Sequence, residues 1–373
     1  MGKKKLLIIQ VVPSGFGGIQ SYAKSLKKNL NKEQIKVINL ETYTVNYKGN
    51  ILINSFLKII KIIQNSFKLR NHIIKYKNDY KIILHNHVAM KISFWENSWY
   101  SFIGKLSMIP YIFHIHSSLF CIEYEKSNFI EKKVRDIILK HCSKVVALSN
   151  YWKKKFLKIN CLNKKKIITI NNFIDDSIFK NISKQEARKI LKIPFNKKII
   201  LSFGRFVEIK GFQFLLDSIP DIVAKRKDII FFIGGQGKMY NYYIKKIKEN
   251  SISDFANLIG YIPNEKSYLW FHASDIFVLP SLRETFPISI IEAMASGTPV
   301  IGSRVGAIPE IINSEEFGLI TEPGNSKDLT EKISIALNKK WNEKDIIENT
   351  KKYTWYNIKK DILKLYQDII KNT

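Results

Sequence analysis

The most constraining feature of the sequence is the stretch Ser281–Ile312, SLRETFPISIIEAMASGTPVIGSRVGAIPEII, in which signals for loop, helix and strand follow one another closely. The short apolar run Asp275–Pro280 before it predicts a buried strand. Pro287 suits the first turn of a helix, where its missing N–H has no partner to lose. Gly297 suits the left-handed position just past the end of that helix, and Thr298–Gly302 predicts the next buried strand. This order is typical of an α/β fold with a parallel sheet.

Two glutamates in this stretch are candidates for ligand binding. We expect Glu284 in the loop at the carboxyl end of the first strand and Glu292 within the following helix. Ligands of open α/β sheets bind outside the carboxyl ends of the strands, so both carboxylates can face one crevice. Either glutamate alone is more often a solvated surface acid. The pair, in this setting, indicates a binding site.

The same residues carry a resemblance to a known family. Seven residues separate Glu284 from Glu292, and Glu292 opens the segment EAMASGTPV. This arrangement resembles the signature of the retaining glycosyltransferases of family 4, which have the two-domain GT-B fold. The resemblance implies that Glu284 contacts hydroxyls of the donor sugar and that Glu292 holds the ribose of the nucleotide.

Six more residues are implied by the resemblance to line the donor site. They are Gly235, Ile262, Thr285, Phe286, Pro287 and Ile288. Gly235 lies in the strand-to-loop segment IIFFIGGQG, and Ile262 lies in a loop that resembles the one bordering the base. Pro287 replaces a glycine that is common in the family, so it supplies no backbone N–H there.

Two cationic residues follow the strand IILSF that is expected to begin the second domain. Arg205 comes directly after Gly204, and Lys210 lies five residues later in the same loop. At the carboxyl end of a strand they suit a diphosphate, because Arg offers a planar fork of donors and Lys a compact charge. The resemblance implies the same role, since Gly-Arg and Lys-Gly pairs in family 4 stabilise the departing nucleotide.

The beginning of the chain predicts another strand, turn and helix. Leu6–Val12 is strand-like, the turn GFGG follows, and Ile19–Leu30 has a helical pattern. A glycine-rich turn that enters a helix exposes backbone N–H groups to a phosphate, so Gly17 and Gly18 are candidate donor-binding residues. The turn does not fit the full G-x-G-x-x-G spacing, and no dehydrogenase-like site follows from it.

Two expected strands, IILHNH and YIFHIHS, each end in a His-x-His pair. Because side chains of a strand alternate between its faces, we expect that His114 and His116 do not both face one ligand. No nearby carboxylate or cysteine completes a ligand set, so a metal site is disfavoured. The resemblance implies instead that His116 approaches the donor sugar.

The length of 373 residues predicts two domains. With the resemblance, we expect an acceptor-side Rossmann-like domain at residues 1–175 and a nucleotide-sugar domain at 176–353. The two would face each other across a cleft, and a helix over 354–373 would return to the first domain. Three unpaired-looking cysteines, and the absence of a leader or of a span near 20 apolar residues, favour a cytoplasmic location.

The formal net charge of +29 is unevenly distributed. Residues 1–175 carry +22 and residues 176–373 only +7, which implies an anionic partner for the first half. Phe56–Tyr80 reads as an amphipathic helix with a basic face. That face is either simply solvated or rests on anionic lipid at the inner face of the cell membrane.

Together these features favour a retaining, metal-independent glycosyltransferase of the hexosyl type without a bound cofactor. Its donor would be a nucleotide-diphosphate sugar and its acceptor a saccharide, lipid-linked, in assembly of a bacterial-type surface polysaccharide such as capsule or lipopolysaccharide. A sugar-nucleotide epimerase on the same fold would bind the same donor without an acceptor. A basic, non-catalytic protein that binds nucleic acid or membrane would explain the charge, but no compact nucleic-acid motif accompanies it. A catalytically silent relative would keep the fold alone.

Overall fold

The chain folds into two compact α/β units. The structure is a computed structural model that describes residues 4–13, 18–42, 51–89, 91–175, 178–180 and 182–372, apart from the side chains of residues 51, 52 and 91. The first unit comprises residues 1–172 and 358–373, and the second comprises residues 173–357. The sequence-based expectation places these boundaries after residues 175 and 353.

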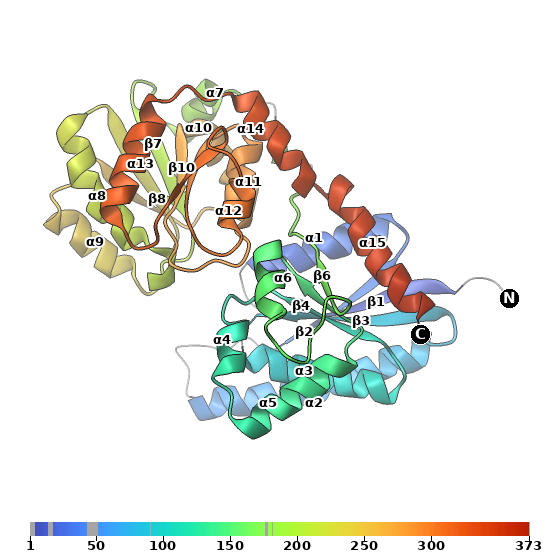
Figure 1. Cartoon of the computed structure of the whole chain (residues 1–373). Helices are drawn as coiled ribbons and strands as arrows, with labels where there is room; N and C mark the ends of the chain where they lie inside the picture. The colour runs from blue at the N-terminus through green and yellow to red at the C-terminus, as the bar shows by residue number, and fades with distance from the viewer. Residues whose placement is uncertain are drawn as a thin grey trace. The chain divides into compact units, whose positions relative to one another are not determined.

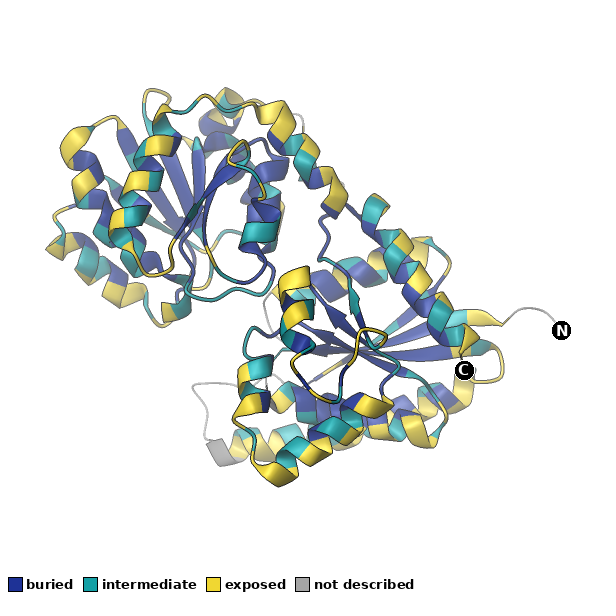
Figure 2. Cartoon of the chain, viewed as in Figure 1, coloured by how far each residue is buried: buried dark blue, intermediate teal, exposed yellow. Residues whose placement is uncertain are grey.

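The first unit contains a six-stranded sheet in the order β2-β1-β3-β4-β5-β6, with every neighbouring pair parallel. Its strands are β1 (Lys5–Val12), β2 (Lys36–Glu41), β3 (Tyr80–Val88), β4 (Tyr111–Ile115), β5 (Lys144–Ala147) and β6 (Ile167–Thr169). The central strands are rich in buried Ile, Leu and Val, as expected where helices cover both faces. Figure 2 shows this buried layer within each unit.

Helices cover both faces of this first sheet (Figure 1). On one face lie α2 (Ile51–Tyr76), α3 (Lys91–Leu106) and α5 (Phe129–His141), and on the other α1 (Gly18–Lys32), α6 (Asn150–Phe156) and α15 (Trp355–Lys371); the short α4 (Phe120–Glu125) precedes α5. The helix expected at Phe56–Tyr80 ends earlier, because Tyr80 already pairs with β1 as the first residue of β3.

The second unit repeats the same architecture with strand order β12-β11-β10-β7-β8-β9, again all parallel. Its strands are β7 (Lys198–Phe203), β8 (Ile229–Gly234), β9 (Ala256–Gly260), β10 (Ile276–Leu279), β11 (Val300–Ser303) and β12 (Gly318–Thr321). The predicted pair of doubly wound α/β domains is therefore confirmed.

Helices also cover both faces of the second sheet (Figure 1). One face carries α8 (Phe212–Lys225), α9 (Tyr240–Glu249) and α13 (Ser326–Asn338), and the other carries α7 (Lys184–Leu191), α10 (Asn264–Ala273), α11 (Ile288–Ala295) and α14 (Glu343–Thr350). Shorter elements are η2 (Glu208–Lys210), α12 (Ile308–Ile311) and η3 (Lys351–Tyr353).

The segment around Ser281–Ile312 folds largely as its sequence indicates. β10 and β11 form the two expected buried strands, and α11 lies between them. Gly297 has a φ of +76°, the left-handed conformation expected just past a helix end. Pro287 differs slightly from expectation, because it precedes the first helical residue, Ile288, as the N-cap.

Helix α15 closes the first unit. Its apolar stripe, Ile358, Ile362, Leu365 and Ile369, is buried as its spacing predicts. Tyr366 on the same helix is completely buried and its hydroxyl lies 2.8 Å from Nδ1 of His85 on β3. The last helix of the chain is therefore part of the core of the unit in which the chain begins.

Candidate functional site

Lys210 and Glu284 meet at the carboxyl ends of two neighbouring strands in the second unit. Lys210 ends the turn η2 after β7, and Glu284 lies in the loop after β10, which pairs with β7. Nζ of Lys210 forms an ion pair with Oε1 of Glu284, and Oγ of Ser281 donates to the same oxygen at 3.0 Å. Both charged side chains are less than one-fifth exposed, so the pair is shielded from bulk water.

Two glycines that the sequence analysis did not single out hold these loops together. A Cβ on Gly211 would lie 1.9 Å from the carbonyl oxygen of Pro280, and one on Gly306 would lie 2.1 Å from that of Glu284. Both have positive φ angles, +71° and +55°, which side chains rarely tolerate. The loops after β7, β10 and β11 therefore approach backbone to backbone around Glu284. In the sequence, the Lys-Gly dipeptide at Gly211 and the glycine in Arg304–Ala307 are the features that could have indicated these close approaches.

Arg205 follows β7 directly and differs from Lys210 in its surroundings. Its side chain is exposed, and within the described part of the chain it forms no ion pair. Its guanidinium is thus a cation at the carboxyl end of the sheet, in the same loop as Lys210. Both cations lie where a diphosphate is expected in an open α/β sheet.

The other predicted donor residues lie in loops at the same ends of the strands. Gly235 follows β8 and donates its N–H to the carbonyl of Gly260 at 2.6 Å. The side chain of Ile262 lies over Gly234, where an added Cβ would come within 2.5 Å of it. Both loops are therefore fixed by close packing at the end of β8.

The segment after Glu284 is placed by its buried side chains. Phe286 is buried and packs edge-to-face on Tyr353, with ring centroids 5.7 Å apart. Thr285 accepts a backbone hydrogen bond from Ala307 at 3.3 Å, and Pro287 is buried. The ring of Phe286 is thus used for packing. Any contact of this residue with the nucleotide sugar therefore has to come from its backbone. Ile288 is the first residue of α11 and is half-buried.

Glu292 lines a pocket within the second unit. The pocket measures about 450 Å³, and its lining includes Lys180, Asn264, Glu265 and Tyr268. Burial raises the pKa of the Glu292 carboxyl from 4.5 to about 7. Neither Lys210 nor Glu284 lines it. The sequence indicates Glu292 but not its neighbours in this pocket, although the loop before Asn264 resembles the one that borders the base in family 4.

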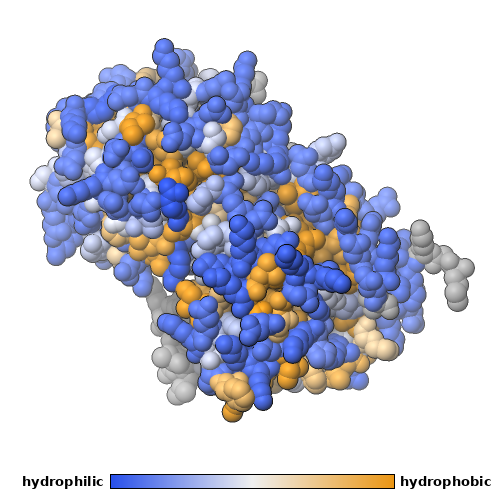
Figure 3. All heavy atoms as spheres, in the orientation of Figure 1, coloured by the Kyte–Doolittle hydropathy of each residue, from blue (hydrophilic) through white to orange (hydrophobic). Residues whose placement is uncertain are grey.

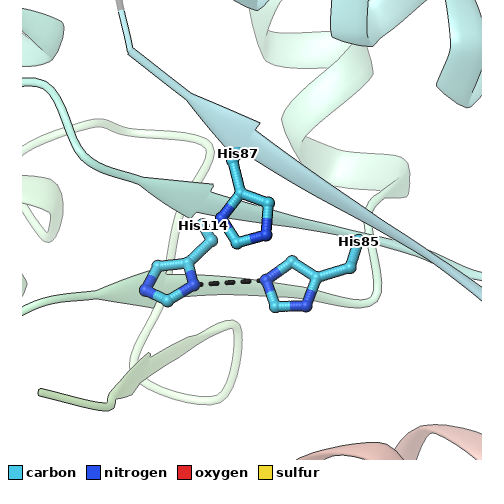
Figure 4. Close-up of side chains that lie close together, drawn as sticks. All are labelled: His85, His87 and His114. Atoms are coloured by element: carbon cyan, nitrogen blue, oxygen red, sulfur yellow. Dashed lines mark hydrogen bonds between the residues drawn. The ribbon is translucent and has the colours of Figure 1, made fainter. Parts of the chain in front are cut away.

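The His-x-His pairs of the first unit form one buried cluster, and the expectation that His114 and His116 diverge is wrong. Adjacent residues of a strand alternate between its faces, but residues two apart share a face. His85 and His87 of β3 therefore lie on the same side as His114 and His116, with ring centroids of the last two 4.2 Å apart. Figure 4 shows three of these rings converging from the two strands.

Hydrogen bonds show which ring nitrogens of His87 and His116 carry the protons. The amide NH₂ of Gln10 faces Oδ1 of Asn39, so its Oε1 accepts from Nε2–H of His87 at 2.8 Å. Burial lowers the pKa of His87 well below 6.5, so the ring is neutral and its Nδ1 is an acceptor. Nε2 of His116, 3.0 Å away, is then the donor. Burial also lowers the pKa of His116 to about 3, so this candidate contact to the sugar is a neutral imidazole.

The cluster does not present three ligands to one metal ion. Nitrogen atoms of His85, His87 and His114 lie within 4.8 Å of one another. The rings of His85 and His87, however, are stacked 4.4 Å apart at an interplanar angle of 16°. A metal bound to imidazole nitrogen lies near the ring plane, and two stacked, nearly parallel planes do not share such a point. The hydrogen bond between His85 and His114, 3.2 Å long, further occupies two of the nitrogens.

The glycine turn of the first unit is only partly described. Gly17 lies outside the described residues. Gly18 is the first residue of α1, and nothing lies within 4 Å of where its Cβ would be. A role for Gly18 at the phosphate stays a prediction that depends on the N–H groups at the start of this helix.

Comparison with known families identifies the two halves of the chain. Residues 16–178 match the model of Glycosyltransferase Family 4, and residues 183–353 match that of Glycosyl transferases group 1. The chain is a GT-B glycosyltransferase of the family 4 type. The gap between the two matched regions lies close to the boundary between the two units.

This glycosyltransferase has relatives along its whole length. It is 25% identical to an uncharacterized glycosyltransferase of Methanocaldococcus jannaschii, over 98% of each chain. Sucrose-phosphate synthase from Thermosynechococcus elongatus has the same fold, with a TM-score of 0.81 at 19% identity over 99% of this chain and 100% of that one. Anabaena HepE, solved in complex with UDP, gives a TM-score of 0.73 at 17% identity over 98% and 100%. Within the described residues, the glycosyltransferase has no helix with the length and apolarity that a membrane span requires.

Proposed function

We propose that this glycosyltransferase moves a hexosyl group from a nucleotide-diphosphate sugar to a saccharide acceptor with retention of anomeric configuration. The observation that supports it most directly is the Lys210–Glu284 ion pair at the carboxyl ends of β7 and β10, with Arg205 in the same loop. It presents a cation for a phosphate and a carboxylate for sugar hydroxyls at one place.

In the proposed reaction, the bond between the anomeric carbon and the β-phosphate oxygen breaks, and its electron pair stays on that oxygen. The acceptor oxygen forms the new bond to the anomeric carbon on the same face, and its proton passes to the departing diphosphate. Lys210 and Arg205 stabilise the charge that develops on the diphosphate, which fixed donors do efficiently. Glu284 and the neutral His116 orient the sugar, while Glu292 holds the ribose.

The chemistry needs no resident metal in this proposal. The sequence contains no Asp-x-Asp motif, and the cationic side chains of Arg205 and Lys210 take the part that a divalent ion plays elsewhere. Transfer should therefore persist after treatment with a chelator. Activity lost to the chelator and restored by Mg²⁺ or Mn²⁺ would contradict this part of the proposal.

The acceptor is proposed to be lipid-linked, which places the enzyme in surface-polysaccharide assembly at the inner face of the cell membrane. The concentration of positive charge in residues 1–175 supports this, because in family 4 the first domain serves the acceptor. Uridine sugars are the first donors to test, since HepE was solved with UDP.

A panel of nucleotide sugars tests the proposal in two steps. A donor present at 100 times its dissociation constant should raise the stability by about 2.7 kcal/mol, which is visible as a thermal shift. The stabilising donor is then incubated with and without saccharide acceptors, and the anomeric configuration of any product is read by NMR. An altered sugar nucleotide formed without acceptor would indicate an epimerase, and an inverted product would refute retention.

A further inference from the structure

The three helices α2, α3 and α5 lie side by side on one face of the first sheet (Figure 1). Nε1 of Trp99 on α3 donates to Oγ of Ser66 on α2 at 2.9 Å. The guanidinium of Arg135 on α5 lies 5.3 Å from the ring centroid of Trp95 on α3. These contacts join the helices into one continuous layer, whose inner side packs on the sheet.

Large apolar side chains point away from the protein on all three helices. We call the region marked by Ile63, Phe67, Trp99, Phe102, Phe129 and Ile130 the outer face; these six side chains are 49–74% exposed. Figure 3 shows hydrophobic side chains among hydrophilic ones along the lower edge of the view, where these helices lie in Figure 1. An apolar surface contributed by three adjacent helices indicates an interaction site.

Helix α2 has two separate apolar stripes. Leu69 and Ile73 are buried against the unit, which accounts for its attachment to the sheet. Ile59, Ile63 and Phe67, spaced four residues apart, form a second stripe that is more than half exposed. Packing within the unit requires only the first stripe. The second stripe therefore leaves more than half of each side chain available to a partner.

The charges on these helices are almost entirely positive. The sequences of α2, α3 and α5 contain eleven Lys or Arg and three acidic residues. Each of the three acids is engaged with a residue of its own unit: Glu96 accepts from Tyr100, Glu131 pairs with Arg135, and Asp136 accepts from Tyr124. A partner of this face thus meets exposed apolar groups and lysines without competing carboxylates.

We propose that the outer face inserts into the headgroup layer of an anionic lipid bilayer. A helix of 26 residues lying flat, with exposed aromatic and aliphatic side chains and flanking lysines, has the composition of an interfacial helix. The apolar side chains would insert into the headgroup layer, and the lysines would favour anionic over neutral lipid. This deepens the proposed function by naming the surface that meets the membrane of a lipid-linked acceptor, and it rests on that function only for the identity of the acceptor.

Vesicle co-sedimentation of the full chain, without nucleotide sugar, tests the inference. The vesicles are phosphatidylcholine alone or with phosphatidylglycerol. The variant Ile63→Ser/Phe67→Ser/Phe102→Ser should partition at least about tenfold more weakly into the anionic vesicles, because three apolar groups no longer leave water. The matched control, Ile190→Ser/Phe195→Ser/Ile335→Ser, removes exposed apolar side chains from the second unit and should partition like the natural chain.

A charge variant provides the second measurement. Lys61→Glu/Lys68→Glu/Lys75→Glu should remove the preference for anionic vesicles. Lys58 is left unchanged because its Nζ lies 3.8 Å from the buried Glu96 and is not a free surface charge. Circular dichroism and the melting temperature check that each variant folds.

Equal partitioning of the Ser variant and the natural chain would overturn the inference, as would equal binding to both kinds of vesicle. A natural chain that binds no vesicle, but forms dimers in sedimentation that the Ser variant loses, would assign the outer face to a second copy instead. Nucleotide-sugar thermal shifts are measured without lipid. A failure of vesicle binding therefore leaves the proposed function standing, and a failure of donor binding leaves this inference testable.

Discussion

The ε-ammonium of Lys210 and the carboxylate of Glu284 neutralise each other in the second unit. A donor that bound here would have to exchange this contact for two others, one from Lys210 to phosphate and one from Glu284 to sugar hydroxyls. The pair therefore keeps two largely buried charges satisfied in the structure, and in the proposed reaction their separation would be coupled to donor binding. Substitutions at the two positions should consequently be non-additive.

Lys210→Ala should lower kcat by about 10²–10³, the effect of losing one preorganised transition-state donor. Glu284→Gln should impair transfer without weakening binding of the free nucleotide diphosphate, because that product carries no sugar for Glu284 to contact and Lys210 no longer has to leave a carboxylate to reach the phosphate. Steady-state kinetics of both single variants and the double variant, with calorimetric titration of the nucleotide, measure this. Additive losses in the double variant would show that the two residues act independently.

Arg205→Ala should lower kcat by a similar factor of about 10²–10³ while leaving the melting temperature unchanged, because the side chain is exposed. Arg226→Ala is the matched control. Arg226 is also on the surface of the second unit, but its guanidinium is paired with Asp228 at 2.8 Å. The control should show normal turnover. Comparable losses in both variants, or none in either, would remove the phosphate role from Arg205.

The raised pKa of Glu292 determines how its contribution to stability changes with pH. Its pKa rises from 4.5 to about 7 on folding, so the unfolded chain loses this proton more readily, and the contribution to stability falls as pH rises from about 4.5 to about 7. Glu292→Gln should remove that part of the pH profile of unfolding. If the ribose hydroxyls bind the carboxylate, nucleotide binding near pH 7 should also release a proton, seen as a dependence of the titration heat on buffer. If the Glu292→Gln variant and the natural chain had the same pH profile of unfolding, the raised pKa of Glu292 would be refuted.

The four buried histidines predict acid sensitivity. Burial lowers the pKa of each below 6.5, so the unfolded chain binds more protons, and stability present above pH 6.5 is lost as pH falls. Each histidine should contribute a slope of up to about 1.4 kcal/mol per pH unit between pH 6 and 4. Urea unfolding across this range measures the slope. His114→Gln should reduce it, whereas the exposed His141→Gln should not; equal slopes in all three proteins would exclude the cluster as the cause.

The parts of the site that follow from local sequence were predictable. Pro287 and Gly297 mark the two ends of α11, and the apolar runs on either side of it form β10 and β11. The positions of Glu284 and Lys210 follow from the rule that parallel strands end at one edge of the sheet. The contact between them depends on which strands are neighbours, and β7 next to β10 is not a local property. The approach of Gly306 to Glu284 is likewise a relationship between loops distant in the sequence.

Two further features show where sequence reasoning ended. The expectation that His114 and His116 do not both face one ligand is wrong, because strand geometry places residues two apart on the same face. The periodicity of Phe56–Tyr80 indicated an amphipathic helix, but a repeat alone does not tell which of two apolar stripes meets the sheet. Leu69 and Ile73 face inward, while Ile63 and Phe67 remain outside, because only the first stripe meets the sheet.

Helix α15 has a consequence for how the chain is made. The first unit needs Ile362, Leu365 and Tyr366 to complete its core, yet these residues follow the whole of the second unit in the sequence. The other strands and helices of this unit leave the ribosome before α15 does. Until then, the apolar surface that α15 covers is exposed. The second unit, which is contiguous in the chain, has all its residues available first. We therefore expect the order of maturation to be the reverse of the order of translation.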